Sequence, residues 1–359
     1  MKRIVLTGGG TAGHVTPHLA LLPRLLENNY EVHYIGTQSG IERQVMALPG
    51  VTYHVIQSGK LRRYFSWKNL SDPFRVIQGA LQASRVIKQL KPAVCFSKGG
   101  FVGVPVVFAA WCHKVPVLCH ESDLTPGLAN RISAGMAVRV ACTFPECAKA
   151  LGPKGILTGT PLRPQLFSGS RHEGMKIAGF SGKKPVLLMM GGSQGAQSVN
   201  KVLREALSGI LPLMDVFHQC GKGNLDTALA GKPGYFQIEF MNDELPHALA
   251  CADLVLSRAG ANALCEFQAL KKPMLLIPLP LSASRGDQIL NAKSFETRGL
   301  AQVLLQEDLN RDALVKALVS LQQNATQLRT ALEKAPAADG TNDVLDLIEA
   351  VQRTNTQGI

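Results

Sequence analysis

The chain has 359 residues, of which 46% are hydrophobic and 18% charged, and its net charge at neutral pH is +12. This length is enough for two domains of ordinary size, each with its own core. No run of about 18 apolar residues occurs, which excludes a membrane-spanning helix. The apolar run at the amino end is too short for a signal peptide, so we expect a cytoplasmic protein. The eight cysteines form no C-x-x-C pair, and we expect reduced, buried thiols rather than a zinc site.

The excess positive charge lies in the first half of the chain. Residues 1–162 carry 18 Lys and Arg against 7 Asp and Glu, a net charge of +11, whereas residues 163–359 carry 20 against 19, a net charge of +1. This asymmetry indicates that the first half faces an anionic surface, either a membrane or a nucleic acid. A nucleic acid would explain the charge but not the polar residues that follow the predicted strands, so we expect no nucleic-acid partner.

Predicted strands and helices alternate along both halves of the chain. The first half has strands at 2–7, 31–37, 51–56, 93–98, 115–121, 138–144 and 155–160, with helices that include 18–29 and 75–91. The pattern restarts after residue 163, with strands at 184–190, 214–221, 235–241, 252–258, 273–280 and 301–306 and helices that include 196–210 and 311–323. Such alternation is typical of parallel sheets.

We therefore predict an α/β protein with two Rossmann-like domains, residues 1–162 and 163–340, whose parallel sheets face a central cleft. A polar segment with two prolines, residues 158–174, is the predicted linker. We expect a helix at about 341–359 that packs back on the first domain. In sheets of this kind, ligands bind outside the carboxyl ends of the strands.

The glycines of segment 8–13 match the pattern G-x-G-x-x-G directly after the first predicted strand. A dinucleotide site also needs a carboxylate at the end of the second strand, where this chain has Gln38. Glu31 lies before that strand and Glu42 lies in the next helix, so we expect no NAD here. The loop still forms a helix N-terminus suited to an anion. The alternative is a tight turn without a ligand.

Segment 252–273 contains a strand, a turn of small residues and a helix in which Glu266 is the one carboxylate. A buried carboxylate near the start of a helix is costly unless something hydrogen-bonds to it. The hydroxyls of a ribose would do so, which predicts a nucleotide site in the second half. The alternative is that Glu266 is an ordinary capping or surface residue.

Motifs along essentially the whole chain resemble a known family. They are, in order, GGTAGHVTP, SKGGFVGVP, HESDLTPGLANR, GTPLRP, GGSQGAQSVN, HQCGKGN, SRAGANALCEF and SRGDQILNA. This set closely resembles the MurG family of N-acetylglucosaminyltransferases, which convert lipid I to lipid II in peptidoglycan synthesis. The resemblance implies the GT-B fold, with the donor UDP-GlcNAc held mostly by the C-terminal domain. It also implies that the N-terminal domain contacts the acceptor and the membrane.

By matching motif, the resemblance implies a set of donor-binding residues: Thr11, Ala12, Gly13, Asp123, Arg163, Ser193, Gln194, Met241, Ala263, Leu264, Glu266, Asp287 and Gln288. Among them, Met241 falls where a backbone group reads uracil, and Glu266 matches the ribose-binding carboxylate. Asp287 and Gln288 match the pair that reads the GlcNAc hydroxyls. The residues implied for the acceptor diphosphate are Gly10, Gly99 and Gly100. Some members have Asn where this chain has Asp123, and a carboxylate accepts hydrogen bonds but cannot donate them as an amide does.

The resemblance implies an inverting transfer of GlcNAc from UDP-GlcNAc to the MurNAc 4-hydroxyl of undecaprenyl-diphosphate-MurNAc-pentapeptide, which is lipid I. Two residues are candidates for the general base. His14 ends the first glycine loop, and Glu121 ends a predicted strand. The sequence leaves this choice open. No D-x-D pair occurs, so we predict a site without a metal or a cofactor, in which Arg163 and helix N-termini stabilise the diphosphate.

The stretch 60–75 interleaves cations with aromatic residues, as interfacial segments do. Its predicted membrane contacts are Arg62, Arg63, Phe65, Trp67 and Lys68. The alternative is a solvated loop that leads into a helix. We expect a peripheral protein on the inner, anionic face of the cell membrane, with UDP-GlcNAc, lipid I and other cell-wall synthesis proteins as partners.

Alternatives from other functional classes remain at this point. Another GT-B enzyme that uses a UDP-sugar, either a glycolipid transferase or a UDP-GlcNAc 2-epimerase, would share the two-domain architecture. A non-catalytic UDP-sugar-binding protein would also share it. Release of UDP, measured with and without a polyprenyl-diphosphate acceptor, separates these possibilities.

Overall fold

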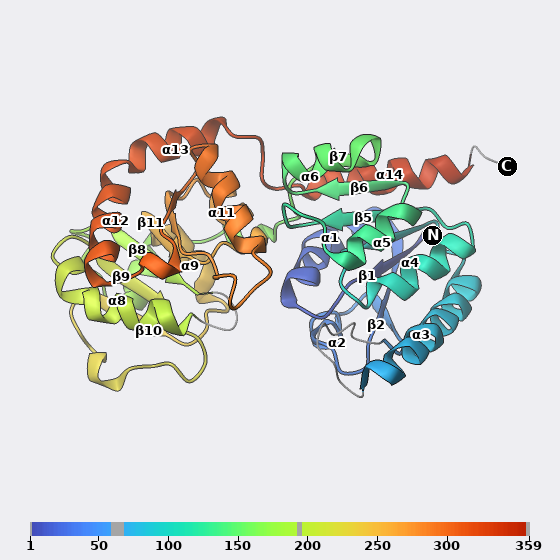
Figure 1. Ribbon diagram of the computed structural model, residues 1–359, viewed down its shortest axis with the longest axis horizontal. Helices are drawn as coiled ribbons and strands as arrows, with labels where there is room; N and C mark the ends of the chain where they lie inside the picture. Colours follow the sequence, from blue (N-terminus) through green and yellow to red (C-terminus); the bar gives the residue numbers. More distant parts are fainter. Residues whose placement is uncertain (1, 59–67, 192–195, 357–359) are drawn as a thin grey trace. The chain divides into compact units, whose positions relative to one another are not determined.

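The computed structural model describes residues 2–58, 68–191 and 196–356. The chain divides into two compact units (Figure 1). The first contains Met1–Arg163 and Asp339–Ile359, and the second contains Pro164–Ala338. Each unit is built around one parallel sheet that helices cover. The chain therefore enters the second unit once and returns to the first with its last segment.

The sheet of the first unit has seven parallel strands in the order β3-β2-β1-β4-β5-β6-β7. The strands are β1 (Lys2–Thr7), β2 (Tyr30–Gly36), β3 (Val51–Val55), β4 (Val94–Ser97), β5 (Val117–Glu121), β6 (Arg139–Cys142) and β7 (Gly155–Leu157). All residues of β4 and β5 are buried, which explains why their sequences lack an alternating pattern. The strand order reverses between β1 and β4, the point at which ligands bind in open α/β sheets.

Helices connect these strands, and the last helix of the chain joins the same core. They are η1 (Ala12–His14), α1 (Thr16–Glu27), α2 (Ile41–Val45), α3 (Lys68–Leu90), α4 (Gly103–Cys112), α5 (Leu128–Met136), α6 (Pro145–Ala150), η2 (Gly152–Lys154) and α14 (Thr341–Thr356). In the core, Leu21 and Leu25 of α1 are fully buried in one cluster with Val344 and Ile348 of α14. This apolar contact holds α14 on the first unit, although α14 follows the second unit in the sequence.

The sheet of the second unit has six parallel strands in the order β10-β9-β8-β11-β12-β13. The strands are β8 (Val186–Met190), β9 (Asp215–Gln219), β10 (Tyr235–Ile238), β11 (Leu254–Ser257), β12 (Met274–Leu276) and β13 (Gln302–Val303). Counted from the first strand of each unit, this order repeats that of the first sheet, and the reversal falls between β8 and β11. The restart of the sequence pattern after residue 163 therefore corresponds to a second Rossmann-like sheet.

The helical elements of the second unit are η3 (Pro164–Phe167), α7 (Arg171–Ala178), α8 (Gln197–Ile210), η4 (Thr227–Leu229), α9 (Glu244–Cys251), α10 (Ala261–Ala269), α11 (Asp287–Thr297), η5 (Gln306–Asp308), α12 (Arg311–Gln323) and α13 (Ala325–Lys334). One core cluster joins Leu203 and Leu207 of α8 to Leu314 and Leu318 of α12. Helix α7 begins within the segment 158–174 that we expected to be a linker. Ser170 caps α7, because its hydroxyl accepts a hydrogen bond from the N–H of residue 173 at 3.4 Å.

All eight cysteines are free, and all but Cys112 are buried, as we expected for reduced thiols. Within the described parts of the chain, no helix combines the length and the apolar character that crossing a membrane requires.

Candidate active site

Two glycine loops of the first unit pack against each other at the reversal point of its sheet. Gly10 follows β1 and Gly100 follows β4, and both have positive φ angles, +90° and +77°. A Cβ on Gly100 would lie 2.2 Å from the carbonyl oxygen of Gly9, and one on Gly10 would lie 2.5 Å from the Phe101 ring. Only glycine fits at these two positions. The structure thus brings together the first loop and the Gly99-Gly100 loop, which we predicted to meet the acceptor diphosphate.

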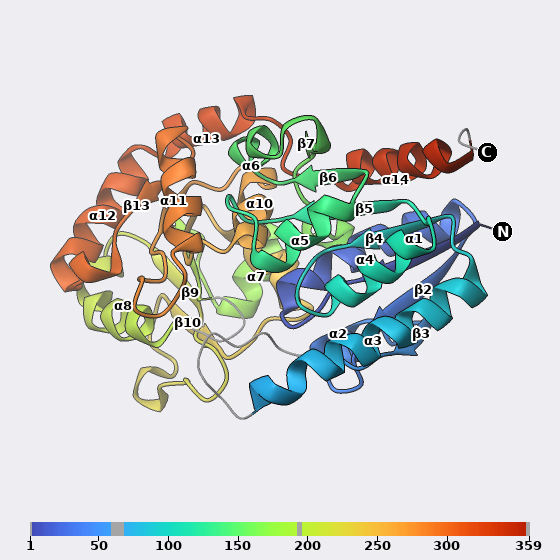
Figure 2. The same ribbon diagram turned by 45° about the vertical axis from the view of Figure 1, so that its right-hand side comes forward.

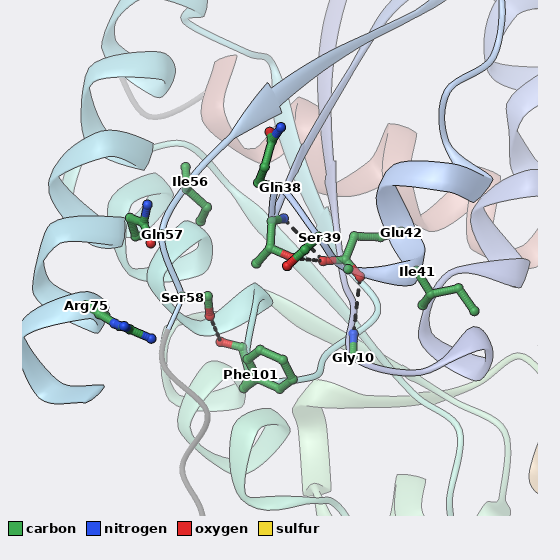
Figure 3. Close-up of a pocket in the computed structure, with 12 residues that line it drawn as sticks. Gly10, Gln38, Ser39, Ile41, Glu42, Ile56, Gln57, Ser58, Arg75 and Phe101 are labelled. Carbon is green, nitrogen blue, oxygen red and sulfur yellow. Dashed lines mark hydrogen bonds between the residues drawn. The ribbon is translucent and has the colours of Figure 1, made fainter. Parts of the chain in front are cut away.

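A buried carboxylate, Glu42 of α2, lies against the first glycine loop (Figure 3). Its side chain is fully buried. Oε2 accepts a hydrogen bond from the Gly10 N–H at 3.4 Å, and Oε1 accepts from the Thr37 N–H at 3.2 Å and from Thr37 Oγ1 at 2.5 Å. The sequence gives one clue to this contact, an acidic residue soon after the second strand. We had discounted Glu42 only as a ribose ligand.

These contacts bear on the predicted binding of an anion. The Gly10 N–H already points to the Glu42 carboxylate, and the Gly99 N–H donates to Ser97 Oγ at 3.3 Å. Both bonds are long, and each occupies an N–H that a diphosphate would use. Contacts between Gly10, Gly99 or Gly100 and the acceptor therefore stay a prediction.

His14 ends the short helix η1, and its side chain is half-buried. Its ring Nδ1 lies 3.0 Å from Thr11 Oγ1, and its backbone N–H donates to the Thr11 carbonyl at 3.1 Å. If the proton is on Nδ1, the ring donates to the Thr11 hydroxyl and its lone pair is on Nε2. A general base requires this tautomer. Ala12 and Gly13 lie between the two residues in the same turn.

Glu121, the other candidate base, is the last residue of β5 and is 5% exposed. Its Oε1 accepts from the Asp123 N–H at 3.0 Å. Its Oε2 accepts from the Gly127 N–H at 3.2 Å and from Asn130 Nδ2 at 2.8 Å. Burial raises the pKa of this carboxyl, against the opposing effect of these hydrogen bonds. Both oxygens therefore hold the loop 122–127, whereas the half-buried His14 ring is more accessible.

A buried lysine, Lys98, connects three strand ends next to the second glycine loop. It is 1% exposed, and its Nζ lies 2.7 Å from His120 Nδ1 and contacts Ser122 Oγ. His120 Nε2 lies 2.9 Å from the Gly159 carbonyl oxygen, to which it donates. Burial and the neighbouring Lys98 charge hold the pKa of His120 well below its usual range. The clue to this cluster in the sequence is a lysine, Lys98, at the end of the apolar predicted strand 93–98 and within the motif SKGGFVGVP.

In the second unit, α10 begins at the reversal point of the sheet. The N-cap of α10 is Gly260, which supplies no side chain, and the Leu264 N–H donates to the Gly260 carbonyl at 3.0 Å. The N–H groups of the first turn, which includes Ala263, have no acceptor within the helix and favour an anion. Glu266 follows in the same helix. Its side chain is half-buried, not buried as we expected, and so is accessible from solvent.

Three other residues that we predicted to bind UDP-GlcNAc make contacts at the carboxyl ends of the strands of the second sheet. Gln288 Oε1 accepts from the Ala259 N–H at 3.3 Å and from the Leu279 N–H at 3.1 Å, which joins the segments after β11 and β12. The Met241 N–H donates to Oε1 of Gln219, the last residue of β9, at 3.3 Å. Asp287 begins α11, with its Oδ2 3.6 Å from the Nε of residue 285. Their roles toward UDP-GlcNAc stay predictions.

Other predicted residues lie apart from these clusters or outside the described chain. Arg163 ends the first unit, and its buried Nε has no hydrogen-bond partner among the residues that the structure describes. Ser193, Gln194, Arg62, Arg63, Phe65 and Trp67 lie outside the described residues, and Lys68 is the first residue of α3. Among the described residues, no three His, Cys, Asp or Glu side chains are placed to hold a metal ion.

Comparison with known proteins gives the family. Residues 4–142 match the glycosyltransferase family 28 N-terminal domain, and residues 186–350 match the C-terminal domain of that family. A protein of Clostridium kluyveri is 51% identical over 350 residues, which cover 97% of this chain and 99% of that protein. Its name is UDP-N-acetylglucosamine--N-acetylmuramyl-(pentapeptide) pyrophosphoryl-undecaprenol N-acetylglucosamine transferase.

Solved structures agree with this assignment. The crystal structure of Acinetobacter baumannii MurG superposes with a TM-score of 0.78 at 25% identity, covering 98% of this chain and all of that one. A putative UDP-N-acetylglucosamine 2-epimerase from Listeria monocytogenes superposes with a TM-score of 0.69 at 14% identity, covering 98% and 96%, and shows the fold alone. The protein is thus a glycosyltransferase with the GT-B fold, and it belongs to family 28 and, within that family, to the MurG N-acetylglucosamine transferases.

Proposed function

We propose that this chain transfers GlcNAc from UDP-GlcNAc to the 4-hydroxyl of MurNAc in lipid I and so produces lipid II for peptidoglycan. The observation that carries this proposal is 51% identity, over 97% of the chain, to a relative whose name states the donor and the acceptor. An epimerase, a glycolipid transferase or a non-catalytic sensor would share the fold, but none of these is favoured by identity at this level.

On the acceptor side, His14 is the proposed general base. The Thr11 hydroxyl, 3.0 Å from Nδ1, fixes the ring, and Nε2 takes the proton from the sugar hydroxyl as it attacks the anomeric carbon. A single displacement by that hydroxyl inverts the anomeric centre, so an α-linked donor gives a β-linked product. Glu121 then has a positioning role, because its carboxylate holds the backbone of the loop that contains Asp123.

On the donor side, the second unit holds UDP-GlcNAc. Glu266 of α10 accepts hydrogen bonds from the ribose hydroxyls, and the first turn of the same helix faces the diphosphate. Arg163, with its buried Nε lacking a partner among described residues, adds a positive charge to the leaving group. These groups can stabilise the charge that develops on UDP without a metal ion. We therefore propose that the reaction needs no essential metal.

The protein acts at the surface of the anionic membrane that holds its acceptor. Helices α3 and α4 pack against each other (Figure 2). Both helices expose large apolar side chains. On α3, Ile77 and Leu81 are 58% and 59% exposed, and on α4, Phe108 and Trp111 are 46% and 55% exposed. Such exposed apolar side chains support a peripheral membrane contact, in keeping with the positive charge of the first half.

The reaction can be tested with purified protein, UDP-GlcNAc and a short-chain polyprenyl-diphosphate-MurNAc-pentapeptide. We expect release of UDP only when this acceptor is present. Release without the acceptor would indicate hydrolysis or epimerisation, and release only with diacylglycerol would indicate a glycolipid transferase. Either result would overturn the proposed function.

A further inference from the structure

The first unit contains a cavity of about 380 Å³ at the carboxyl ends of β1, β2 and β3 (Figure 3). Its walls come from the first glycine loop, from the segment after β2 and the start of α2, and from the segment after β3. Helix α3 and Phe101 complete the lining. The volume lies within the range of about 300–1,000 Å³ that is usual for small-ligand sites. None of the residues that we predicted to bind the donor lines this cavity, whereas Gly10, predicted on the acceptor side, does.

The lining is chiefly polar and neutral. It presents the amide and hydroxyl side chains of Gln38, Ser39, Gln57 and Ser58. Both oxygens of the Glu42 carboxylate accept hydrogen bonds from the loops around it. Arg75 of α3 is the one cationic residue in the described lining, and Figure 3 shows its guanidinium extending toward the cavity. Arg75 ends the stretch 60–75 that we interpreted as interfacial, and it lines this cavity.

This chemistry fits a peptide better than a diphosphate. A diphosphate would place its charges beside the buried Glu42 carboxylate, and the Gly10 N–H that it would need already points to that carboxylate. A peptide offers amide groups to the amide and hydroxyl lining, and it ends in one carboxylate that Arg75 can pair with. Ile56 and Phe101 add apolar surface for side-chain methyl groups.

We propose that this cavity is the subsite for the peptide of the acceptor, with a peptide carboxylate bound to Arg75. The inference rests on the proposed function, because it assigns part of the same acceptor. It also explains why a polar cavity adjoins the glycine loop that carries the proposed base. The peptide then contributes to acceptor binding at a distance from the reacting sugar hydroxyl.

The test compares two short-chain, soluble acceptors that are identical except for the peptide. One carries the pentapeptide, and the other carries a methylamide in its place. The variant Arg75→Gln removes the charge, and Ser39→Phe places a ring at the wall of the cavity. Arg85→Gln is the matched control, because Arg85 is exposed on the same helix and does not line the cavity. The measured quantity is kcat/KM for each acceptor, from UDP release.

We expect Arg75→Gln to lower kcat/KM about tenfold for the pentapeptide acceptor, near the weak end for a charge-assisted hydrogen bond because Arg75 is exposed. Ser39→Phe should cause a similar loss, and neither variant should change kcat/KM for the peptide-free acceptor. An equal loss with both acceptors would assign Arg75 to the diphosphate and overturn the proposal. So would no loss with either acceptor. Failure of the wild type to use any MurNAc acceptor would instead refute the proposed function.

Discussion

The effect of replacing the buried Glu42 carboxylate can be predicted, because the hydrogen bonds that it accepts are known. Glu42→Gln keeps the volume but replaces one oxygen with an NH2 group. In either orientation, that group faces an N–H or O–H donor of Gly10 or Thr37. A buried donor left without an acceptor costs about 1–3 kcal/mol. Because the Gly10 bond is long, at 3.4 Å, we expect the free energy of unfolding to fall by about 2 kcal/mol.

The same substitution should also affect catalysis, because the loop that Glu42 holds leads into Thr11 and His14. A displacement of about 1 Å in a catalytic group can cost about 100-fold, so we expect kcat/KM to fall by about 10- to 100-fold. Unfolding in urea and UDP release would measure the two effects. Glu31→Gln is the control, since Glu31 is a partly exposed carboxylate paired with Arg3 at the surface. If Glu42→Gln and Glu31→Gln have equal effects, Glu42 does not hold the loop.

Four further predictions concern the ribose contact, the general base, two buried histidines and the need for a metal ion. Glu266→Ala should weaken UDP-GlcNAc binding by about 10- to 100-fold in calorimetry, and unchanged affinity in a folded variant would reject the ribose contact. His14→Ala should lower kcat by about 10²- to 10⁴-fold with little change in donor affinity. Glu121→Gln should lower kcat less, and the reverse order would make Glu121 the base. Burial lowers the pKa of His18 and of His218 to about 3, so only the unfolded chain binds these protons as pH falls below about 6.5. The free energy of unfolding should then fall by about 2 kcal/mol for each histidine between pH 7 and pH 5, and a pH-independent value would show that they are not buried as described. EDTA should leave UDP release largely intact, whereas complete loss that Mg²⁺ or Mn²⁺ restores would disprove the metal-free mechanism.

The architecture was predictable because it depends on local signals. Each strand is a short apolar run that ends in a glycine or polar turn, and the restart after residue 163 marked the second sheet. One local signal was overlooked. Ser170 followed three residues later by Glu173 is a typical helix start, and it marks α7 within the segment that we expected to be a linker.

The candidate site was less predictable, because its key contacts join residues that are far apart in the sequence. The Glu42 carboxylate reaches Gly10 across 32 positions, and Lys98 reaches His120 across 22. No periodicity or motif in the sequence indicates that these groups are in contact. Many of the described residues implied by family resemblance lie in turns after strands, as Gly10 and Asp123 do, or in the helices that follow these turns, as Ala263 and Glu266 do. Which of these residues contact a substrate stays a prediction.

The most direct test of the central claim is identification of the product. The wild-type protein would be incubated with UDP-GlcNAc labelled in the sugar and the short-chain MurNAc-pentapeptide acceptor, and the product would be analysed by mass spectrometry and NMR. We predict an acceptor heavier by one GlcNAc, β-linked to the MurNAc 4-hydroxyl, together with one UDP for each acceptor consumed. An unmodified acceptor beside an epimerised or hydrolysed UDP-sugar would contradict the account, as would an α-linked product.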